Sequence, residues 1–450
     1  MKEDNILIIG AGLCGTLLAI RLAQRGLRVK LYEKRPDMRR HAISAGRSIN
    51  LALSKRGLLA LQRVGLEEQV LQACIPMRGR MVHPLGGEAF FSPYSGRPQD
   101  YINSVSRGGL NSLLLDEAEA LGIPIYFHTA CLEVDLQQAE ARFENRQTGR
   151  QWSERGQVII GADGAGSAVR RSLMAHSPDL LFNYSQHFLR HGYKELSILP
   201  HEQKGWRIEQ HALHIWPRDQ FMIIALPNLD GSFTVTMFHP FEGEMGFRQL
   251  NTPERLRQFF EQYFPELIAL MPHYREEFFQ NPTGSLGTIK CFPWQAYGRV
   301  LIMGDAAHAI VPFYGQGMNA AFEDVRVFDD LLEECGPKWE EVFTRFEVSR
   351  APNTDAIADL ALDNFIEMRD RVDDEDFIRK RRLERWLEQQ FPDYYSKYSL
   401  VTFRPDLPYR EAMRLGRRQD ELLLELCSQQ APEEMDLQAV HAQLMQLQQA

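Results

Sequence analysis

Residues 5–33 read NILIIGAGLCGTLLAIRLAQRGLRVKLYE, and this stretch decides the fold. The apolar run from Ile6 to Ile9 is typical of a strand that is buried on both faces. Apolar residues at helical spacing follow from Thr16 to Arg25, and Gly26 is placed to end that helix. The run at 29–32 predicts a second strand. This order of strand, turn, helix and strand predicts an α/β unit with parallel strands.

The turn inside this unit carries the spacing GxGxxG at Gly10, Gly12 and Gly15. Glycines let a backbone approach a pyrophosphate, and a helix N-terminus offers free N–H groups and a positive dipole end. Glu33 ends the second strand, where a carboxylate can accept hydrogen bonds from ribose hydroxyls and would repel a 2′-phosphate. The stretch therefore predicts a bound dinucleotide, disfavours NADP at this position, and leaves NAD and FAD as alternatives.

The composition of the 450-residue chain is close to that of an average soluble globular protein, with 44% hydrophobic and 25% charged residues. A net charge of −9 argues against a surface that grips nucleic acid or anionic lipid. The six cysteines form no CxxC pair, so neither a disulfide scaffold nor a metal site is expected. No apolar run approaches the ~18 residues that a membrane span needs. We expect a cytoplasmic protein.

The rest of the chain alternates between strand and helix patterns. Buried strands are predicted at 157–160 and 299–303, a β-rich region at 206–240, and helices at 55–75, at 110–121 and after 316. No repeat and no Gly/Ser linker marks a boundary. The domains are therefore expected to interleave.

Two further Gly/Asp stretches follow predicted buried strands. The first is GADGAGSAVR at 161–170, and the second runs from GDAAH at 304–308 to PFYGQGMN at 312–319. In this order after GxGxxG they resemble the three motifs of the FAD-dependent aromatic hydroxylases, the group A flavoprotein monooxygenases. The resemblance implies that Asp305 binds the ribityl chain, that Asp163 lies where flavin and nicotinamide meet, and that residues 315–319 lie against the flavin ring, where N–H groups stabilise electron-rich flavin.

Within that family, six shorter stretches resemble the kynurenine 3-monooxygenases. They are GRSINLALS at 46–54, MRGRM at 77–81, SVSR at 104–107, LHIWPR at 213–218, FED at 322–324 and NFIEMR at 364–369. The resemblance extends from about residue 6 to residue 405. Eukaryotic members carry a C-terminal membrane anchor, whereas the tail here is polar and Gln-rich, so the resemblance implies a form without a membrane span.

The motifs and the resemblance together predict an α/β fold with interleaved domains. A glutathione-reductase-type, Rossmann-like FAD-binding domain is expected at 1–70, 100–178 and 286–330. A mixed β-sheet substrate domain is expected at 71–99 and 179–285. A C-terminal helical region is expected at 331–450.

The resemblance implies that the substrate is L-kynurenine and that Arg80, aided by the Tyr94 hydroxyl, binds its α-carboxylate. A guanidinium can grip a carboxylate bidentately. Alternation in the strand expected around MRGRM would place Arg78 and Arg80 on one face, and only the resemblance selects Arg80. Asn364 and Tyr398, with Glu367 nearby, would complete the polar end, although periodicity alone predicts ordinary helix polarity there. The substrate ring would be walled by Leu213, Met222, Ile224, Leu226, Phe238, Pro312 and Phe313.

The cofactor candidates combine the glycine turn with residues that the resemblance adds. Arg47 and Arg107 are suited to the FAD phosphates or to closing the ring site. No side chain is assigned as catalytic, because positioning and flavin chemistry suffice. The full set of cofactor-binding candidates is Gly10, Gly12, Gly15, Glu33, Arg47, Arg107, Cys131, Asp163, Asp305, Gly317, Met318 and Asn319.

The resemblance also implies the reaction. NADPH reduces the flavin, reduced flavin and O₂ form a flavin hydroperoxide, and the distal oxygen is transferred to the ring carbon ortho to the amine of L-kynurenine. The product is 3-hydroxykynurenine, in the kynurenine pathway of tryptophan degradation and NAD biosynthesis. NADPH is expected to dock transiently, because no second GxGxxG has its own βαβ unit. The alternatives are a flavin monooxygenase acting on another aromatic acid, and a flavoprotein oxidase or reductase of the same fold. The sequence leaves open whether the protein forms a homodimer.

Overall fold

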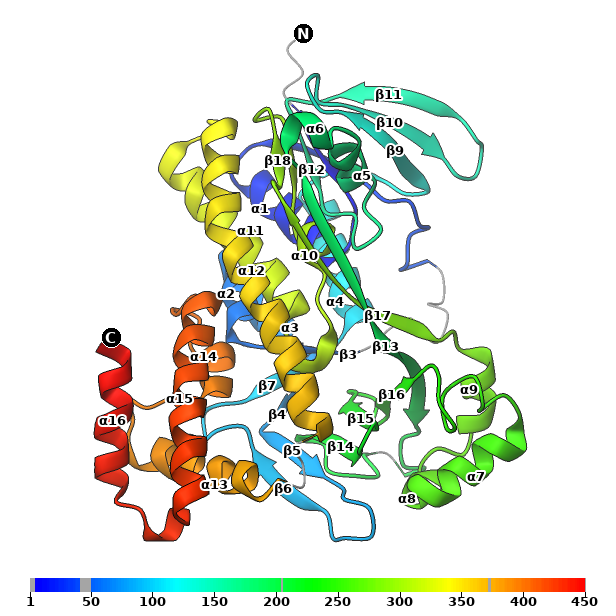
Figure 1. Ribbon diagram of the computed structural model, residues 1–450. Coiled ribbons are helices and arrows are strands. Elements are labelled where there is room, and N and C mark those ends of the chain that lie inside the picture. The colour runs from blue at the N-terminus through cyan, green and yellow to red at the C-terminus, as the bar shows by residue number, and fades with distance from the viewer. Residues whose placement is uncertain (1–4, 41–49, 204, 371–373, 450) are drawn as a thin grey trace.

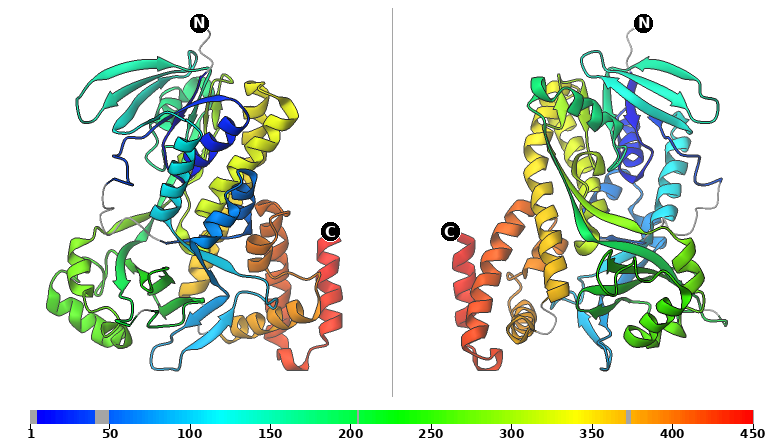
Figure 2. Two further views of the ribbon diagram at one scale, coloured as in Figure 1. Left: turned by 180° about the vertical axis from the view of Figure 1, so that it is seen from behind. Right: turned by 45° about the vertical axis from the view of Figure 1, so that its right-hand side comes forward.

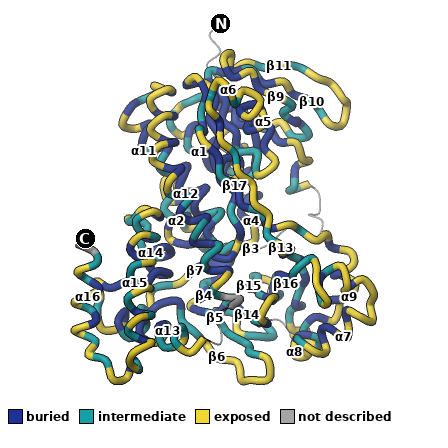
Figure 3. Tube along the Cα trace, viewed as in Figure 1, coloured by how far each residue is buried: buried dark blue, intermediate teal, exposed yellow. Residues whose placement is uncertain are grey.

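The computed structural model describes residues 5–40, 50–203, 205–370 and 374–449 (Figure 1). Arg47, a predicted cofactor residue, lies outside the described residues. A six-stranded sheet lies at one end of the molecule and a seven-stranded sheet at the other, and the C-terminal helices pack along one side (Figure 2). Buried residues concentrate on α1, α11 and the strands beside them (Figure 3).

The six-stranded sheet contains the decisive stretch of sequence. Its strand order is β18-β19-β12-β1-β2-β8, and all its pairs are parallel except β18 with β19. The predicted strands at 6–9, 29–32, 157–160 and 299–303 and the helix after the glycine turn are confirmed. The elements are β1 (Asn5–Ile9), α1 (Leu13–Gln24), β2 (Arg28–Tyr32), β8 (Ile125–Tyr126), β12 (Val158–Gly161), β18 (Gln295–Ala296) and β19 (Val300–Ile302).

Long helices and a small antiparallel sheet surround this sheet. Among them, α1 packs against α4 and α11, and α5 packs against β9. The antiparallel sheet β11-β10-β9 was not predicted. The elements are α4 (Arg107–Ala120), β9 (Thr129–Asp135), β10 (Glu140–Asn145), β11 (Gln151–Arg155), α5 (Ala168–Ala175), α6 (Ser177–Leu180), α10 (Asp305–His308), α11 (Gly317–Cys335) and α12 (Trp339–Asp370).

The seven-stranded sheet has the order β17-β13-β16-β15-β14-β5-β6. Its strands alternate between two cores: Ile223 and Ala225 pack toward α7–α9, whereas Met222 and Leu226 pack toward the opposite face. The elements are β5 (Gly79–Val82), β6 (Phe90–Pro93), β13 (Asn183–Ile198), β14 (Ala212–Arg218), β15 (Phe221–Pro227), β16 (Phe233–Pro240), α7 (Pro253–Tyr263), α8 (Pro265–Ile268), α9 (Tyr274–Gln280) and β17 (Gly284–Phe292).

A three-stranded sheet, β3-β7-β4, contacts the seven-stranded sheet through β4 and β14. The helical pattern expected at 55–75 forms two helices, which Gly65 separates with a left-handed φ of +80°. It ends earlier than expected, because residues 74–77 are a strand. The elements are β3 (Asn50–Leu53), α2 (Lys55–Arg63), α3 (Glu67–Gln72), β4 (Cys74–Met77) and β7 (Ile102–Ser106).

The chain after residue 316 is helical, as predicted. Within the described ranges, no helix is long and apolar enough to cross a membrane. The residue boundaries of the predicted domains stay predictions. The last elements are η1 (Pro312–Tyr314), α13 (Glu375–Gln390), α14 (Lys397–Phe403), α15 (Tyr409–Gln429), η2 (Pro432–Glu434) and α16 (Leu437–Gln449).

Candidate active site

One cavity of about 590 Å³ brings most of the predicted site residues together. Its walls come from the turn after β1, from β3 and β5, from the seven-stranded sheet, from residues 305–321 and from α14. The predicted residues that line it are Gly10, Gly12, Glu33, Arg107, Cys131, Asp163, Asp305, Gly317, Met318, Arg80, Tyr94, Leu213, Met222, Ile224, Leu226, Phe238, Pro312, Phe313 and Tyr398.

The glycine turn forms a close-packed cradle at the first end of the cavity, here called the dinucleotide end. A Cβ at Gly15 would lie 2.0 Å from the carbonyl oxygen of Gly10, and a Cβ at Gly10 would lie 2.4 Å from that of Ala162. At Gly12 a Cβ would meet no atom within 4 Å, so this glycine faces open space. Among the described residues no side chain caps the N-terminus of α1, and its first turn has no acidic residue. The first residues of α1 line the cavity, where their free N–H groups can meet an anion.

Glu33 at the end of β2 is almost fully buried, with 5% exposure. Its carboxylate accepts hydrogen bonds from the backbone N–H of Ala11 at 3.0 Å and of Arg35 at 3.0 Å. The bond from Ala11 attaches the end of β2 to the glycine turn. Glu33 also lines the cavity, where a carboxylate can accept hydrogen bonds from hydroxyl groups.

Two aspartates follow glycine-rich turns and line the same cavity. Asp305 is exposed after Gly304, which has a φ of +58°, and its carboxylate forms no hydrogen bond or ion pair within the described ranges. Asp163 Oδ2 accepts the N–H of Ala168 at 2.6 Å, whereas Oδ1 is buried with no described partner. Burial raises the pKa of Asp163 above its ordinary value.

The remaining cofactor candidates divide into lining and supporting residues. Burial raises the pKa of the Cys131 thiol to about 12, so it is a neutral wall group at pH 7. Asn319 does not line the cavity: it donates to the Ala52 oxygen at 2.8 Å and accepts from Ser54 N at 2.9 Å. Like Gly15, it fixes the shape of the cradle from behind.

The dinucleotide end fits FAD. A positive helix end suits a pyrophosphate, and the glycine cradle leaves the backbone accessible. Asp163 Oδ1, which has no partner among the described residues, and the exposed Asp305 carboxylate suit hydroxyl groups. The N-terminus of α11 is also uncapped by a side chain, and its residues Gly317 and Met318 line the cavity. These N–H groups can stabilise negative charge beside them.

Arg80 lies in the wall at the other end of the cavity, here called the substrate end. Its guanidinium carbon lies 4.9 Å from the centre of the Tyr398 ring and 5.5 Å from that of Tyr94. Within the described part of the chain Arg80 forms no ion pair, and it is half-buried. Arg80 lies within β5, whereas Arg78 precedes β5 and is exposed. Arg80 is therefore a cation available to an anionic ligand.

Tyr94 and Tyr398 stack with ring centroids 5.6 Å apart. The Tyr94 hydroxyl oxygen is buried and has no partner among the described residues. Burial raises the pKa of Tyr94 well above its ordinary value, so the hydroxyl keeps its proton and can donate a hydrogen bond at neutral pH. A buried donor without a partner, beside a cation without an ion pair in the described part of the chain, matches one carboxylate with two oxygens.

The structure places Asn364 and Glu367 behind the cavity wall. Asn364 donates to the carbonyl oxygen of Phe313 at 2.6 Å, and Phe313 lines the cavity. Glu367 forms an ion pair of 2.5 Å with Lys397 on α14. Asn364 supports the wall residue Phe313, and Glu367 pairs with the residue next to Tyr398; whether either contacts substrate stays a prediction.

Several lining residues were not predicted from sequence. Tyr314 stacks on Tyr398 with ring centroids 5.4 Å apart. Its position within the 312–319 stretch could have indicated from the sequence that it lies in the site. Four cations also line the cavity, and two of them directly follow Glu33 in the sequence. These cations are Lys34, Arg35, Arg146 and Arg171.

Known proteins are similar in sequence to this chain over most of its length. The family described as FAD binding domain matches residues 3–334. The chain is 48% identical over 427 residues to a kynurenine 3-monooxygenase of Myxococcus xanthus, covering 94% of this chain and 91% of that protein. It is 42% identical over 440 residues to a kynurenine 3-monooxygenase of Dictyostelium discoideum, covering 95% of this chain and 94% of that protein.

Solved structures share the fold at lower identity. The 2-methyl-3-hydroxypyridine-5-carboxylic acid oxygenase superposes with a TM-score of 0.66 at 23% identity, covering 86% of this chain and 98% of that chain. PqsL of Pseudomonas aeruginosa, in complex with 2-aminobenzoylacetate, gives a TM-score of 0.63 at 22% identity, covering 82% of this chain and 97% of that chain. The predicted α/β fold of a flavin-dependent monooxygenase is confirmed. The chain belongs to the FAD binding domain family and, within it, to the kynurenine 3-monooxygenases.

Proposed function

We propose that this protein hydroxylates L-kynurenine to 3-hydroxykynurenine with FAD as bound cofactor and NADPH and O₂ as co-substrates. The observation that carries the proposal is the position of Arg80. It is a cation without an ion pair in the described structure, next to the unpartnered Tyr94 hydroxyl, in the wall of the cavity that also contains the FAD cradle. An aromatic amino acid has the matching parts: a carboxylate for Arg80 and a ring for the apolar wall.

Arg80 and Tyr94 bind the α-carboxylate in this proposal. A guanidinium and a phenol hydroxyl both donate hydrogen bonds, and the stacked Tyr398 ring limits how far Arg80 can swing. Fixing one end of the substrate fixes the direction of the other. The aromatic ring then lies along the apolar residues of β15 and β16 and beside Phe313.

The apolar wall excludes water from the reacting end. Met222, Leu226 and Phe238 are buried side chains of one core cluster, and Phe313 packs on Phe238 with ring centroids 5.0 Å apart. Bound FAD supplies the redox chemistry, accepting electrons from NADPH and activating O₂ for transfer of one oxygen atom. The chain contributes a dry, shaped space and, at α11, N–H groups that stabilise negative charge. The amine of the substrate already activates the neighbouring ring carbon.

The nicotinamide cofactor has no second glycine-rich βαβ unit in the sequence. Transient docking at the mouth of the FAD cradle accounts for this. Lys34, Arg35, Arg146 and Arg171 line that part of the cavity and suit anionic groups.

The test is a stopped-flow measurement of flavin reduction by NADPH in the holoenzyme, with and without L-kynurenine, combined with product identification. The proposal expects faster NADPH oxidation in the presence of L-kynurenine and one 3-hydroxykynurenine formed per NADPH consumed. Acceleration that yields only H₂O₂ would contradict the hydroxylase function. No acceleration by L-kynurenine, but acceleration by another aromatic acid, would reassign the substrate.

A further inference from the structure

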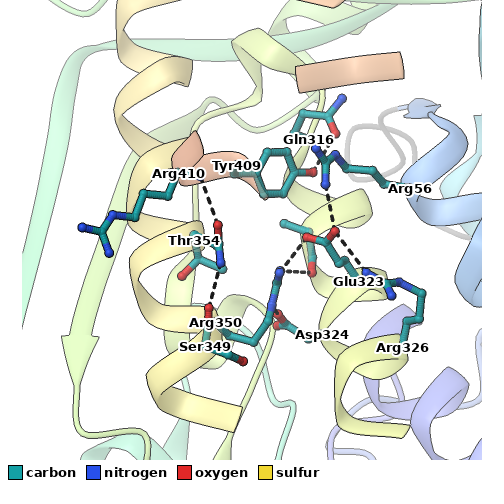
Figure 4. Close-up of polar contacts among 12 residues, drawn as sticks. Arg56, Gln316, Glu323, Asp324, Arg326, Ser349, Arg350, Thr354, Tyr409 and Arg410 are labelled. Carbon is teal, nitrogen blue, oxygen red and sulfur yellow. Dashed lines mark hydrogen bonds and ion pairs between the residues drawn. The ribbon is translucent and has the colours of Figure 1, made fainter. Parts of the chain in front are cut away.

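A chain of buried charged side chains links α2, α11 and α12 in the protein interior (Figure 4). Arg56 of α2 pairs with Glu323 of α11 at 2.9 Å, and Glu323 pairs with Arg350 of α12 at 2.6 Å. Arg350 pairs in turn with Asp324 at 2.7 Å. None of the four side chains is more than 5% exposed. The signs alternate, so the chain is neutral as a whole. It contains Glu323 and Asp324 of the FED stretch at 322–324, which the proposed chemistry does not use.

The Arg56 end fixes the backbone between α14 and α15. Arg56 donates to the carbonyl oxygens of Val401 at 2.9 Å, Arg404 at 2.9 Å and Leu407 at 2.5 Å. Its guanidinium carbon lies 4.0 Å from the centre of the Tyr409 ring. Val401 is in α14 (Lys397–Phe403), the short helix that also carries Tyr398. Arg56 therefore determines where the helix of the substrate end lies.

The Asp324 end fixes the turn that carries Asp305. Asp324 Oδ2 accepts the backbone N–H of Gly304 at 3.0 Å and contacts His308 Nε2 at 2.5 Å. Gly304 and His308 enclose Asp305, which lines the dinucleotide end. Burial opposes ionisation of Asp324, but the charges of His308 and Arg350 outweigh it and keep the pKa of Asp324 below its ordinary value.

A hydrogen bond outside this ion-pair chain also links α15 to the residue before α11. The hydroxyl of Tyr409, at the start of α15, donates to Gln316 Oε1 at 2.9 Å (Figure 4). Gln316 is 2% exposed and directly precedes α11, whose residues Gly317 and Met318 line the cavity. The start of α15 thus contacts the segment that leads into α11, in addition to the indirect link through Arg56.

Burying four charges is costly, and apolar packing of the same volume stabilises a fold as well or better. What a hydrogen-bonded ion chain adds is a fixed geometry between the elements that it joins, here α2, α11, α12 and α14. Removing one partner leaves a buried charge uncompensated, so a shift at one end is transmitted to the other.

We propose that Arg56 and Asp324 are positioning residues that couple the two ends of the cavity: the chain Arg56–Glu323–Arg350–Asp324 ties the helix of Tyr398 to the turn of Asp305. Ligand contacts at Tyr398 thereby change the surroundings of the flavin. The inference rests on the proposed function, because it takes L-kynurenine as the ligand at Tyr398.

The test is a double-mutant cycle in the holoenzyme with Arg56→Lys and Asp324→Asn. Two quantities are measured: the ratio of flavin reduction rates with and without L-kynurenine, and the change in flavin absorption when L-kynurenine is added. Each single variant is expected to lower the ratio at least about tenfold and to shrink the spectral change. The loss of the ratio in the double variant is expected not to exceed the larger of the two single losses, because both substitutions interrupt the same chain of ion pairs.

Arg326→Met is the matched control. Arg326 pairs with Glu323 at 3.5 Å from the solvent side, and its ion pairs involve neither α14 nor the 304–308 turn. It is expected to keep the wild-type ratio. Single variants with the wild-type ratio, or a double variant whose loss is the product of the two single losses, would overturn the coupling. A wild-type flavin that does not respond to L-kynurenine would instead overturn the proposed function, and the inference with it.

A milder variant covers the case in which the charge variants do not fold. Tyr409→Phe removes the hydrogen bond to Gln316 and keeps the ring that contacts Arg56. It is expected to lower the reduction ratio about threefold while FAD stays bound. A wild-type ratio and a wild-type spectral change in this variant would contradict the role of the C-terminal helices.

Discussion

The two ends of the cavity are built in different ways. The dinucleotide end is formed mainly by backbone: Gly10, Gly12 and Gly15 lie within six residues of each other, and the N-terminus of α1 follows at once. The substrate end is formed by side chains from separate segments. Arg80 comes from β5, Tyr94 from the residue after β6, and Tyr398 from α14. At a site formed by backbone, substitution of a single glycine can abolish binding. At a site formed by side chains, the binding energy is divided among several groups, so the loss of one group weakens binding only in part.

The largest effect is expected at the dinucleotide end. Gly15→Ala would place a Cβ 2.0 Å from the Gly10 carbonyl oxygen, a backbone atom that cannot move without opening the turn. FAD affinity should fall by at least about 100-fold, or about 3 kcal/mol. Flavin absorbance per protein after purification measures this. Gly109→Ala is the control, because its Cβ would meet Ser106 at an ordinary 3.5 Å, and it should retain FAD. A Gly15→Ala protein with full FAD content would refute the cradle.

The second effect is expected at the substrate end. Arg80→Met should raise the KM for L-kynurenine by a factor equivalent to about 2–5 kcal/mol, because a desolvated carboxylate loses its cation. FAD content should stay at the wild-type level. Arg78→Met is the matched control, since Arg78 is exposed and does not line the cavity. Equal KM values for the two variants would remove Arg80 from the site.

The third effect concerns a single hydrogen bond. Tyr94→Phe removes a buried hydroxyl that has no partner among the described residues. The KM for L-kynurenine should rise about fivefold, or about 1 kcal/mol, because the substrate carboxylate loses one donor. The melting temperature of the ligand-free protein should not fall. If stability fell and KM stayed unchanged, the hydroxyl would serve the fold rather than the substrate.

The smallest effect concerns the stability of the dinucleotide end. Burial raises the pKa of Asp163, so the folded state binds its proton more tightly than the unfolded state does. The stability contributed by the protonated form is complete at low pH and is lost as pH rises from the ordinary carboxyl range to the raised pKa. Asp163→Asn, which keeps an acceptor for Ala168, should therefore raise the melting temperature at pH 7 and not at pH values below about 4. A pH-independent difference would contradict the burial argument.

The fold could be predicted where the signal is local. Apolar runs mark the strands and the helix at 5–33. They also mark the strands that precede the turns at residues 161 and 304. Strand β13 has no such signal in its first half, which is mostly exposed, because its pairing with β17 brings together residues about a hundred positions apart. The sheet β11-β10-β9 was missed for a different reason: its strands are neighbours in the sequence, but they contain many polar and charged residues and no apolar run.

The site residues also differ in how well they could be predicted from the sequence. Gly10, Gly12 and Glu33 could be placed from sequence because the motif itself contains their geometry. Arg80 could not be distinguished from Arg78 without the family resemblance, since the choice depends on where β5 begins. Helical periodicity does not show which side of a wall Asn364 occupies, and that depends on how α12 packs.

The central claim is that Arg80 binds the carboxylate of a substrate whose ring lies toward the FAD cradle. The most direct test compares kcat/KM for L-kynurenine with kcat/KM for its decarboxylated analogue, kynuramine, in the wild type and in Arg80→Met. Our account predicts that the wild type favours L-kynurenine by at least about 30-fold and that the preference falls to near one in the variant. An unchanged preference in Arg80→Met would contradict the account.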